Sequence, residues 1–178
     1  MKRLFLIGYM GAGKTTMGKL LAKTEELEFV DLDLFIESRY QKSIGEIFES
    51  VGEHKFREIE NNILKEVSEF EDVVISTGGG TACFFDSMPF MNQMGTTIYL
   101  KSSPEALAKR LSGFKDKRPL IKNKSEIELL EFISDNLKKR EPFYNQAHLI
   151  FNTGEFESVE EAEILVDELI TELKKLKK

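Results

Sequence analysis

Short apolar runs alternate along the chain with longer segments in which apolar positions recur at helical spacing. The short runs predict strands at residues 4–7, 29–30, 73–76, 97–100 and 148–151. The longer segments predict a helix from Lys14, two or three helices between residues 33 and 70, a helix at 104–111 and a closing helix from Ser158, where Glu161 completes a capping pattern. Short strands separated by helices are typical of a parallel sheet covered on both faces. The pattern therefore predicts a five-stranded α/β fold.

Composition and charge fit one folded domain. With 178 residues, of which 41% are apolar and 31% charged, the chain is typical of a globular protein. Its net charge of −6 argues against broad binding to nucleic acid but not against a local basic pocket for an acidic metabolite. The single cysteine, Cys83, excludes an intramolecular disulfide and suggests a reducing compartment. No apolar run is long enough to span a bilayer, so we expect a cytoplasmic protein without membrane or nucleic-acid partners.

Residues 8–15 read G-Y-M-G-A-G-K-T and lie between the first predicted strand and the first predicted helix. In this context the G-x-x-x-x-G-K-T pattern binds phosphate, because its glycines let backbone N–H groups turn toward an anion at the positive end of a helix. Lys14 can reach the terminal phosphates, and the Thr15 hydroxyl suits Mg²⁺. A plain glycine-rich turn is the alternative. The lysine–threonine pair and its position favour a nucleoside triphosphate.

The predicted strand at residues 73–76 is not followed by an acid; it continues as Ser76-Thr77 and three glycines. In most ATPases and GTPases the strand beside the phosphate loop ends in an acid that helps to hold Mg²⁺. Asp31 and Asp33, after the second predicted strand, are the candidates here, because open parallel sheets bind ligands at the carboxyl ends of their strands. A pair of helix N-caps is the alternative, and Asp33 suits that role.

Two arginines stand where they could bind an acidic substrate. Arg57 lies off an apolar helical stripe, and Glu60 one turn later can hold its guanidinium for bidentate capture of a carboxylate. The stripe consists of Phe56, Ile59, Ile63, Val67 and Phe70. A solvated Arg–Glu pair is the alternative. Arg140 lies where a predicted helix ends, and an ordinary cation at a helix C-terminus is its alternative.

Two segments predict loops that contact a ligand. Residues 113–125 are polar, lysine-rich and without periodicity, which is typical of a lid. Arg118 within them could stabilise charge on a phosphate after the lid has closed. Gly78, Gly79 and Gly80 follow the third predicted strand and let a ligand approach the backbone, with a flexible turn as the alternative.

Taken together, these residues resemble the shikimate kinase family over nearly the whole chain. The motifs are G-x-x-G-x-G-K-T at residues 8–15, D-x-D at 31–33, F-R-x-x-E at 56–60, G-G-G at 78–80, R-P-L at 118–120 and R-x-x-x-Y at 140–144. The resemblance implies ATP-dependent phosphorylation of the shikimate 3-hydroxyl, a step toward chorismate and the aromatic amino acids. It also implies one P-loop kinase domain over residues 1–178 with sheet order 2-3-1-4-5, a shikimate-binding region at about 33–60, a lid at about 112–125, and a monomer.

The resemblance implies a role for each matching residue. Asp33 contacts the reacting hydroxyl, while Arg57 and Arg140 hold the shikimate carboxylate. Gly79 offers backbone contact to the substrate. Thr15 coordinates Mg²⁺, which Asp31 supports through water. The implied ATP-binding residues are Gly11, Ala12, Gly13, Lys14, Thr15, Thr16 and Arg118, and the implied catalytic residues are Lys14, Asp33 and Arg118.

Other residues match the family less specifically. Phe48 and Phe56 match aromatic residues that flank the substrate ring, with a core role as the alternative. Arg110 is expected near the adenine, with an ordinary helix-surface arginine as the alternative. The adenine-contacting segment is expected at residues 152–158, where the sequence has no specific pattern.

Other functional classes fit the sequence less well. Gluconate and adenylylsulfate kinases share the phosphate loop and the lid, but the D-x-D, G-G-G and paired arginine features are not expected together in them. A GTPase is disfavoured because residues 123–126 read N-K-S-E rather than N-K-x-D. A nucleotide-binding protein without catalysis is disfavoured by Lys14, Asp33 and Arg118. One cysteine and two histidines make no zinc site, so Mg²⁺, ATP and shikimate are the expected ligands.

Overall fold

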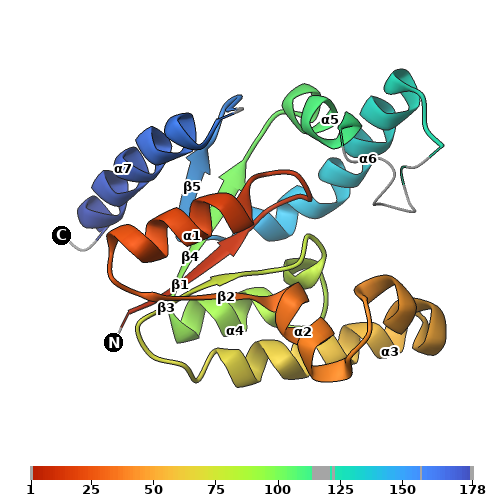
Figure 1. Cartoon of the computed structure of the whole chain (residues 1–178), viewed down its shortest axis with the longest axis horizontal. Coiled ribbons are helices and arrows are strands. Elements are labelled where there is room, and N and C mark those ends of the chain that lie inside the picture. The colour runs from red at the N-terminus through yellow and green to blue at the C-terminus, as the bar shows by residue number, and fades with distance from the viewer. Residues whose placement is uncertain (1, 114–120, 122, 157, 177–178) are drawn as a thin grey trace.

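The computed structural model describes residues 2–113, 121, 123–156 and 158–176, which form one sheet with helices around it (Figure 1). The strands are β1 (Arg3–Ile7), β2 (Glu28–Asp31), β3 (Val73–Ser76), β4 (Thr96–Lys101) and β5 (Leu149–Asn152). All neighbouring strands are parallel, in the order β2-β3-β1-β4-β5. The predicted α/β fold and the sheet order implied by the family resemblance are both confirmed.

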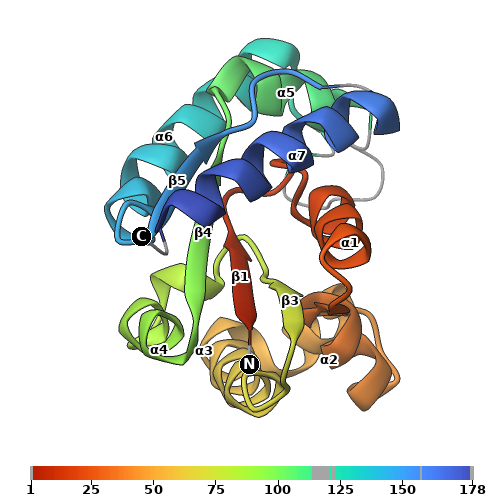
Figure 2. The same cartoon turned by 90° about the vertical axis from the view of Figure 1, so that its left-hand side faces the viewer.

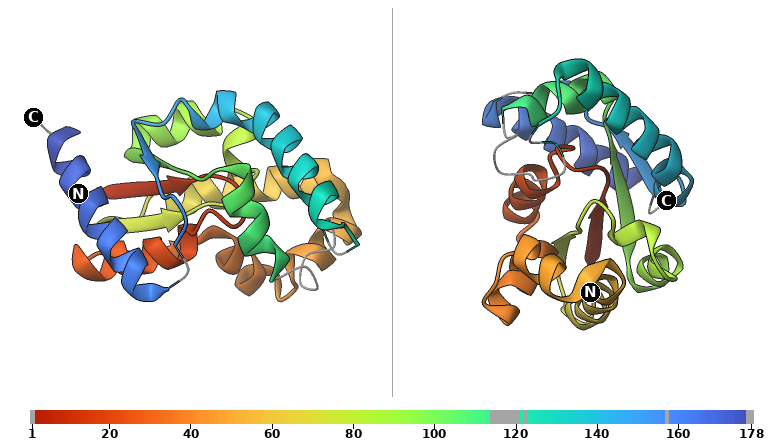
Figure 3. Two further views of the ribbon diagram at one scale, coloured as in Figure 1. Left: turned by 90° about the horizontal axis from the view of Figure 1, so that it is seen from above. Right: turned by 90° about the vertical axis from the view of Figure 1, so that its right-hand side faces the viewer.

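Helices cover both faces of the sheet. They are α1 (Lys14–Thr24), α2 (Leu32–Tyr40), α3 (Ile44–Val67), α4 (Ser87–Met94), α5 (Pro104–Ser112), α6 (Glu126–Tyr144) and α7 (Val159–Leu176), with a short 3₁₀ turn, η1, at Thr81–Cys83. α1 and α7 pack side by side on one face, while α3, α4 and α6 lie on the other (Figures 2 and 3). The chain enters α7 through the predicted Ser158–Glu161 capping pair, in which the Glu161 N–H donates to Ser158 Oγ at 3.1 Å.

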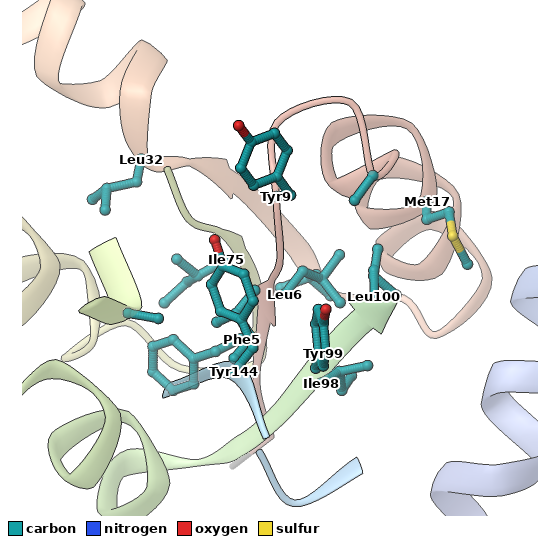
Figure 4. Packing of buried hydrophobic residues seen from close by; sticks show 14 of the residues in the cluster. Phe5, Leu6, Tyr9, Met17, Leu32, Ile75, Ile98, Tyr99, Leu100 and Tyr144 are labelled. Atoms are coloured by element: carbon teal, nitrogen blue, oxygen red, sulfur yellow. The ribbon is translucent and has the colours of Figure 1, made fainter. Parts of the chain in front are cut away.

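Burial explains why the inner strands were easiest to predict. Phe5, Leu6 and Ile7 of β1 are completely buried, and the close view of the core shows β1, β3 and β4 side chains filling the space beside the sheet (Figure 4). A strand buried on both faces needs an unbroken apolar run. The edge strands are partly exposed, with Ile150 of β5 at 42%, and β2 extends beyond its apolar pair at residues 29–30 to Glu28 and Asp31.

The two or three helices expected between residues 33 and 70 are confirmed, one core residue was placed wrongly, and one helix was missed. The predicted helical region at residues 33–70 holds α2 and α3, and α3 is kinked at Gly52, where φ is 76°. Phe70 was expected to continue the core stripe of α3, but this is wrong: the helix ends at Val67 and Phe70 is 40% exposed. Its ring instead meets Phe35 edge-on at 6.2 Å. The sequence analysis also missed α4, an eight-residue helix that contains Pro89 in its first turn.

The carboxyl edge of the sheet gathers the segments with predicted chemistry. There β1 leads into the phosphate-binding loop (residues 8–15), β2 ends at Asp31, and β3 leads into a triglycine turn (residues 78–80). None of the described helices combines the length and apolar character needed to cross a membrane.

Candidate active site

The phosphate-binding loop turns sharply between β1 and α1. Gly11 and Gly13 have φ of 82° and 91°, a region in which a residue with a Cβ is strained. The Lys14 ammonium is buried and donates to the carbonyls of Gly8 at 2.9 Å and Tyr9 at 3.0 Å. The loop and the start of α1 line a cleft of about 640 Å³, whose other walls come from α2, α5 and the segments after β3 and β5. The backbone geometry thus supplies an anion site that opens into a cleft.

Asp31 joins the phosphate-binding loop to α2. Its Oδ1 caps α2 by accepting the backbone N–H groups of Asp33 at 3.2 Å and Leu34 at 3.3 Å. Its Oδ2 accepts the Thr15 hydroxyl at 2.8 Å. The helix cap is therefore Asp31 and not Asp33, which lies in the first turn of α2. Capping leaves Oδ2 facing Thr15, so one carboxylate serves both the helix and the cleft.

The oxygens of Thr15 and Asp31 fit a magnesium ion. Both residues line the cleft, and their side-chain oxygens lie 2.8 Å apart. Mg²⁺ prefers oxygen ligands and is commonly held by one or two protein side chains together with substrate phosphates. Thr15 and Asp31 would supply these protein ligands, and phosphates bound by the neighbouring loop would supply the others.

Asp33 is a carboxyl group in an unfavourable environment for charge. Burial, followed by the nearby carboxylates of Glu60 and Asp31, raises the pKa of Asp33 from 3.8 to about 6, while the Lys14 ammonium opposes the shift. Asp33 lines the cleft beside Lys14. At neutral pH it is ionised but holds a proton more readily than an ordinary aspartate, which suits a group that accepts a proton from a substrate.

Arg57 and Glu60 form a buried ion pair on α3. Arg57 Nη1 donates to Glu60 Oε2 at 2.7 Å, and the two side chains are 12% and 3% exposed. Glu60 Oε1 accepts the Thr81 hydroxyl at 2.6 Å. The alternative of a solvated pair is therefore wrong. The guanidinium is surrounded by the aromatic rings of Phe48, Phe56 and Phe84, whose centroids lie 6.0, 5.2 and 4.4 Å from Arg57 Cζ.

Arg140 reaches the triglycine turn from the last part of α6. Its Nη1 donates to the Gly79 carbonyl at 3.1 Å, and its guanidinium lies 5.2 Å from the centre of the Tyr9 ring. The Tyr144 hydroxyl donates to the same carbonyl at 2.5 Å. Arg140 is thus more than an ordinary cation at a helix end, because it is directed at the backbone of another segment.

The charged groups of the site pack closely against the triglycine turn. A Cβ on Gly78 would lie 2.8 Å from Glu60 Oε1 and 2.9 Å from Asp33 Oδ1, and one on Gly80 would lie 2.6 Å from Arg57 Nη2. Gly79 is the member that Arg140 contacts. Side chains at these positions would displace the charged groups, so the glycines are required for close approach and are not simply a flexible turn.

Comparisons with known proteins agree on one family. A family model for shikimate kinase matches residues 10–174. The shikimate kinase of Parabacteroides distasonis is 60% identical over 152 residues, which are 85% of this chain and 88% of that protein. The chain belongs to the shikimate kinase family. It is therefore a kinase, and a gluconate kinase or a non-catalytic nucleotide-binding protein is not favoured.

Solved shikimate kinases share the fold closely. The crystal structure of shikimate kinase from Bacteroides thetaiotaomicron has a TM-score of 0.94 and 50% identity, covering 97% of this chain and 98% of that chain. Shikimate kinase from Acinetobacter baumannii, solved in complex with shikimate, has a TM-score of 0.85 and 32% identity, covering 98% and 94%.

Most residues predicted for this shikimate kinase site lie together. Those that line the cleft are Gly11, Gly13, Lys14, Thr15, Thr16, Asp31, Asp33 and Gly79. Ala12 is buried within the loop, and Arg57 and Arg140 meet the triglycine turn outside the lining of the cleft. Arg118 lies outside the described residues, as does most of the predicted lid.

Several contacts at the site were not predicted. Thr81 and Tyr144 anchor Glu60 and Gly79, and Phe84 lies against Arg57. At the other end of the cleft, Arg110 of α5 donates to the carbonyls of Gly11 at 3.1 Å and Gly154 at 3.0 Å. Its guanidinium lies 4.1 Å from the centre of the Phe156 ring. The sequence analysis placed Arg110 and residues 152–158 near the adenine and included the tyrosine of the R-x-x-x-Y motif, but it specified none of these contacts.

Proposed function

We propose that this chain transfers the γ-phosphoryl group of ATP to the 3-hydroxyl of shikimate and so produces shikimate 3-phosphate for the pathway to chorismate and the aromatic amino acids. The observation that carries the proposal is the triglycine turn, which contacts Asp33, Arg57 and Arg140 and lies next to the phosphate-binding loop. A carboxylated acceptor and a nucleotide can then meet at one edge of the sheet. The relative from Acinetobacter baumannii, whose structure is in complex with shikimate, supports the choice of acceptor.

Arg57 and Arg140 would bind the acceptor carboxylate. Arg57 uses Nη1 for Glu60, while its buried Nε has no hydrogen-bond partner among the residues that the structure describes. A buried donor without a partner is costly, and a carboxylate would satisfy it. Arg140 uses Nη1 for Gly79 and keeps further donors on its planar guanidinium. Phe48 would lie against an apolar side of the acceptor, and Phe56, which is 3% exposed and whose ring centre is 5.0 Å from that of Phe48, would support it from the core.

Asp33 would orient the reacting hydroxyl and accept its proton as the phosphoryl group is transferred. A loose transition state asks little of a base, so orientation is expected to be the larger share of its effect. Lys14 and the N–H groups of the loop, including Gly11 to Thr16, would neutralise charge on the phosphates. We assign Arg118 to the same task on the basis of its motif.

Thr15 would coordinate Mg²⁺ directly and Asp31 through water. When bound, Mg²⁺ draws charge from the phosphate oxygens and fixes their geometry. The base of ATP would lie beyond the phosphate-binding loop, toward Arg110 and residues 152–158. The stacked guanidinium and ring of Arg110 and Phe156 support this placement, because both offer flat faces to a nucleobase. We further propose that the protein acts as a cytoplasmic monomer in a single domain over residues 1–178.

Coupled measurement of ADP release tests the proposed function. We expect release to require shikimate and Mg²⁺ together, and phosphorus NMR to detect one new phosphate ester. A panel with gluconate and adenylylsulfate as acceptors provides the control. Release of ADP at the same rate without shikimate, or faster turnover of another acceptor, would contradict the proposal.

A further inference from the structure

Tyr144 is a buried polar residue that the proposed mechanism does not use. It is the last residue of α6 and is completely buried. Its hydroxyl donates to the Gly79 carbonyl at 2.5 Å, across 65 residues of sequence. A buried hydroxyl aimed at one backbone oxygen of a ligand-binding turn indicates a specific task for that group.

The Gly79 carbonyl accepts hydrogen bonds from side chains, whereas the carbonyls of Gly78 and Gly80 accept them from the backbone. Gly78 O accepts the Thr81 N–H at 3.3 Å and Gly80 O accepts the Cys83 N–H at 2.9 Å, so both are held within the turn and η1. Gly79 O is instead held by two side chains of α6, Arg140 at 3.1 Å and Tyr144 at 2.5 Å. These two donors use both lone pairs of the carbonyl oxygen. Because a trans peptide places C=O and the following N–H on opposite sides, they also direct the Gly80 N–H away from α6.

The Tyr144 ring is rigidly supported. It packs on the ring of Tyr99 in β4, with centroids 5.0 Å apart and an interplanar angle of 37°. Burial raises the pKa of Tyr144 far above the neutral range, so its hydroxyl stays protonated and remains a donor. The sheet therefore aims the Tyr144 hydroxyl at the turn, whereas Arg140 reaches the same carbonyl through a longer side chain.

We infer that Tyr144 is a positioning residue for the acceptor, holding the triglycine turn and Arg140 in the geometry that receives the acceptor carboxylate without touching it. The inference rests on the proposed function. Without the hydroxyl, the partly buried Gly79 carbonyl oxygen would lack one of its two donors. Arg140, which already donates to this oxygen, could then move closer to it. A guanidinium drawn deeper onto the turn has fewer donors to offer a carboxylate.

The test compares Tyr144→Phe with Tyr99→Phe. Both variants remove one hydroxyl from a pair of buried, packed rings, but the Tyr99 hydroxyl donates to Glu141 at 3.5 Å and makes no hydrogen bond to the turn within the described part of the chain. We expect Tyr144→Phe to raise the KM and the dissociation constant for shikimate about tenfold, which is the effect of losing one well-made hydrogen bond from the displaced Arg140 to the carboxylate. The KM for ATP should change less than about twofold and kcat only slightly, because the phosphate site is intact. Tyr99→Phe should leave all of these constants unchanged.

Two outcomes would overturn the inference. One is an unchanged dissociation constant for shikimate in Tyr144→Phe. The other is an equal rise in KM for shikimate and ATP with loss of thermal stability, as general damage to the core would cause. If the unaltered chain fails to phosphorylate shikimate but uses another carboxylated acceptor, the proposed function fails. The same KM ratio measured with that acceptor then decides the role of Tyr144.

Discussion

The acceptor side and the nucleotide side of the active site are held in different ways. On the acceptor side, Glu60 is 2% exposed and joins Arg57 to Thr81 through bonds of 2.7 and 2.6 Å. On the nucleotide side, Arg110 bonds to two backbone carbonyls at 3.1 and 3.0 Å and stacks on the half-buried ring of Phe156. The acceptor side is a network of buried charges, and this part of the nucleotide side is a partly exposed set of contacts to the backbone of two glycines.

Because the two sides differ in burial, substitutions on the acceptor side should cost more free energy than those on the nucleotide side. Breaking a buried charge pair leaves an uncompensated charge and costs several times more than losing an exposed contact. Contacts within the protein hold the charged groups of the acceptor side in place, which lowers the cost of orienting the acceptor. Changes there should affect both substrate binding and folding, whereas changes on the nucleotide side should affect ATP binding alone.

Asp33→Asn should have the largest effect on activity. We expect kcat to fall by about 10²- to 10⁴-fold, the usual contribution of a positioned acid–base group, while the KM for ATP changes little. Single-turnover measurement of phosphoryl transfer with saturating shikimate checks this. An unchanged rate of transfer would remove Asp33 from the mechanism.

The same substitution should stabilise the fold at neutral pH. The folded-state pKa of Asp33 is raised from 3.8 to about 6, so the folded protein holds this proton more tightly than the unfolded chain. The free energy of unfolding therefore decreases as the pH rises from about 4 to about 6, and at pH 7 the full cost is present. A shift of about two pKa units corresponds to about 3 kcal/mol. Denaturant titrations should show Asp33→Asn gaining stability over the unaltered chain between pH 4 and pH 7, and an equal difference at both pH values would contradict this account.

Arg57→Ala should weaken shikimate binding by about 100-fold, because a desolvated charge contact is worth a few kcal/mol. It should also destabilise the fold by about 3–5 kcal/mol, since Glu60 would be left buried without its partner. Calorimetric titration with shikimate and urea unfolding measure the two effects.

Arg39→Ala is a matched control, because Arg39 and Glu66 form a second Arg–Glu pair whose side chains are 49% and 42% exposed. It should cost less than about 1 kcal/mol of stability and leave binding unchanged. Equal losses of stability in the two variants would show that burial of the Arg57 pair has no energetic weight.

Gly80→Ala should act on the acceptor side without removing any charged group. The new Cβ would lie 2.6 Å from Arg57 Nη2, so the guanidinium must move off Glu60 or the turn must shift. Overpacking of this kind costs about 1–3 kcal/mol, and we expect the KM for shikimate to rise about tenfold. Gly45→Ala in the first turn of α3 is the control, since its nearest neighbour would be Ser43 Oγ at 4.0 Å. Equal KM values in the two variants would contradict the contact between Gly80 and Arg57.

Local patterns in the sequence predict most of the fold but only part of the acceptor network. The inner strands and the phosphate-binding loop are encoded in continuous residues, so periodicity and motif were sufficient. The contacts of Gly79 with Arg140 and Tyr144 span 61 and 65 residues and arise only when α6 packs beside η1. The Arg57–Glu60 pair could be predicted from helical spacing, but its burial among three aromatic rings could not.

Beyond the phosphate-binding loop, the nucleotide side was the part of the site least predictable from sequence. Arg110 and Phe156 come together across 46 residues, and neither belongs to a motif that specifies the contact. Phe156 follows β5 in a segment without periodicity, where side-chain packing and not a repeating pattern determines the conformation.

Phe156→Ala should have the smallest effect and so sharpens the contrast between the two sides. The Phe156 ring lies 4.1 Å from the Arg110 guanidinium and against Gly13, whose hypothetical Cβ would be 2.4 Å from the ring carbon Cζ. An exposed cation–π contact is worth about 0.5–1 kcal/mol, so we expect the KM for ATP to rise about three- to fivefold and the KM for shikimate to stay constant. Steady-state kinetics with each substrate varied in turn separates the two constants. A lower KM for ATP would mean that the ring obstructs the cleft beside Gly13, and a raised KM for shikimate would mean that the two sides of the site are mechanically coupled.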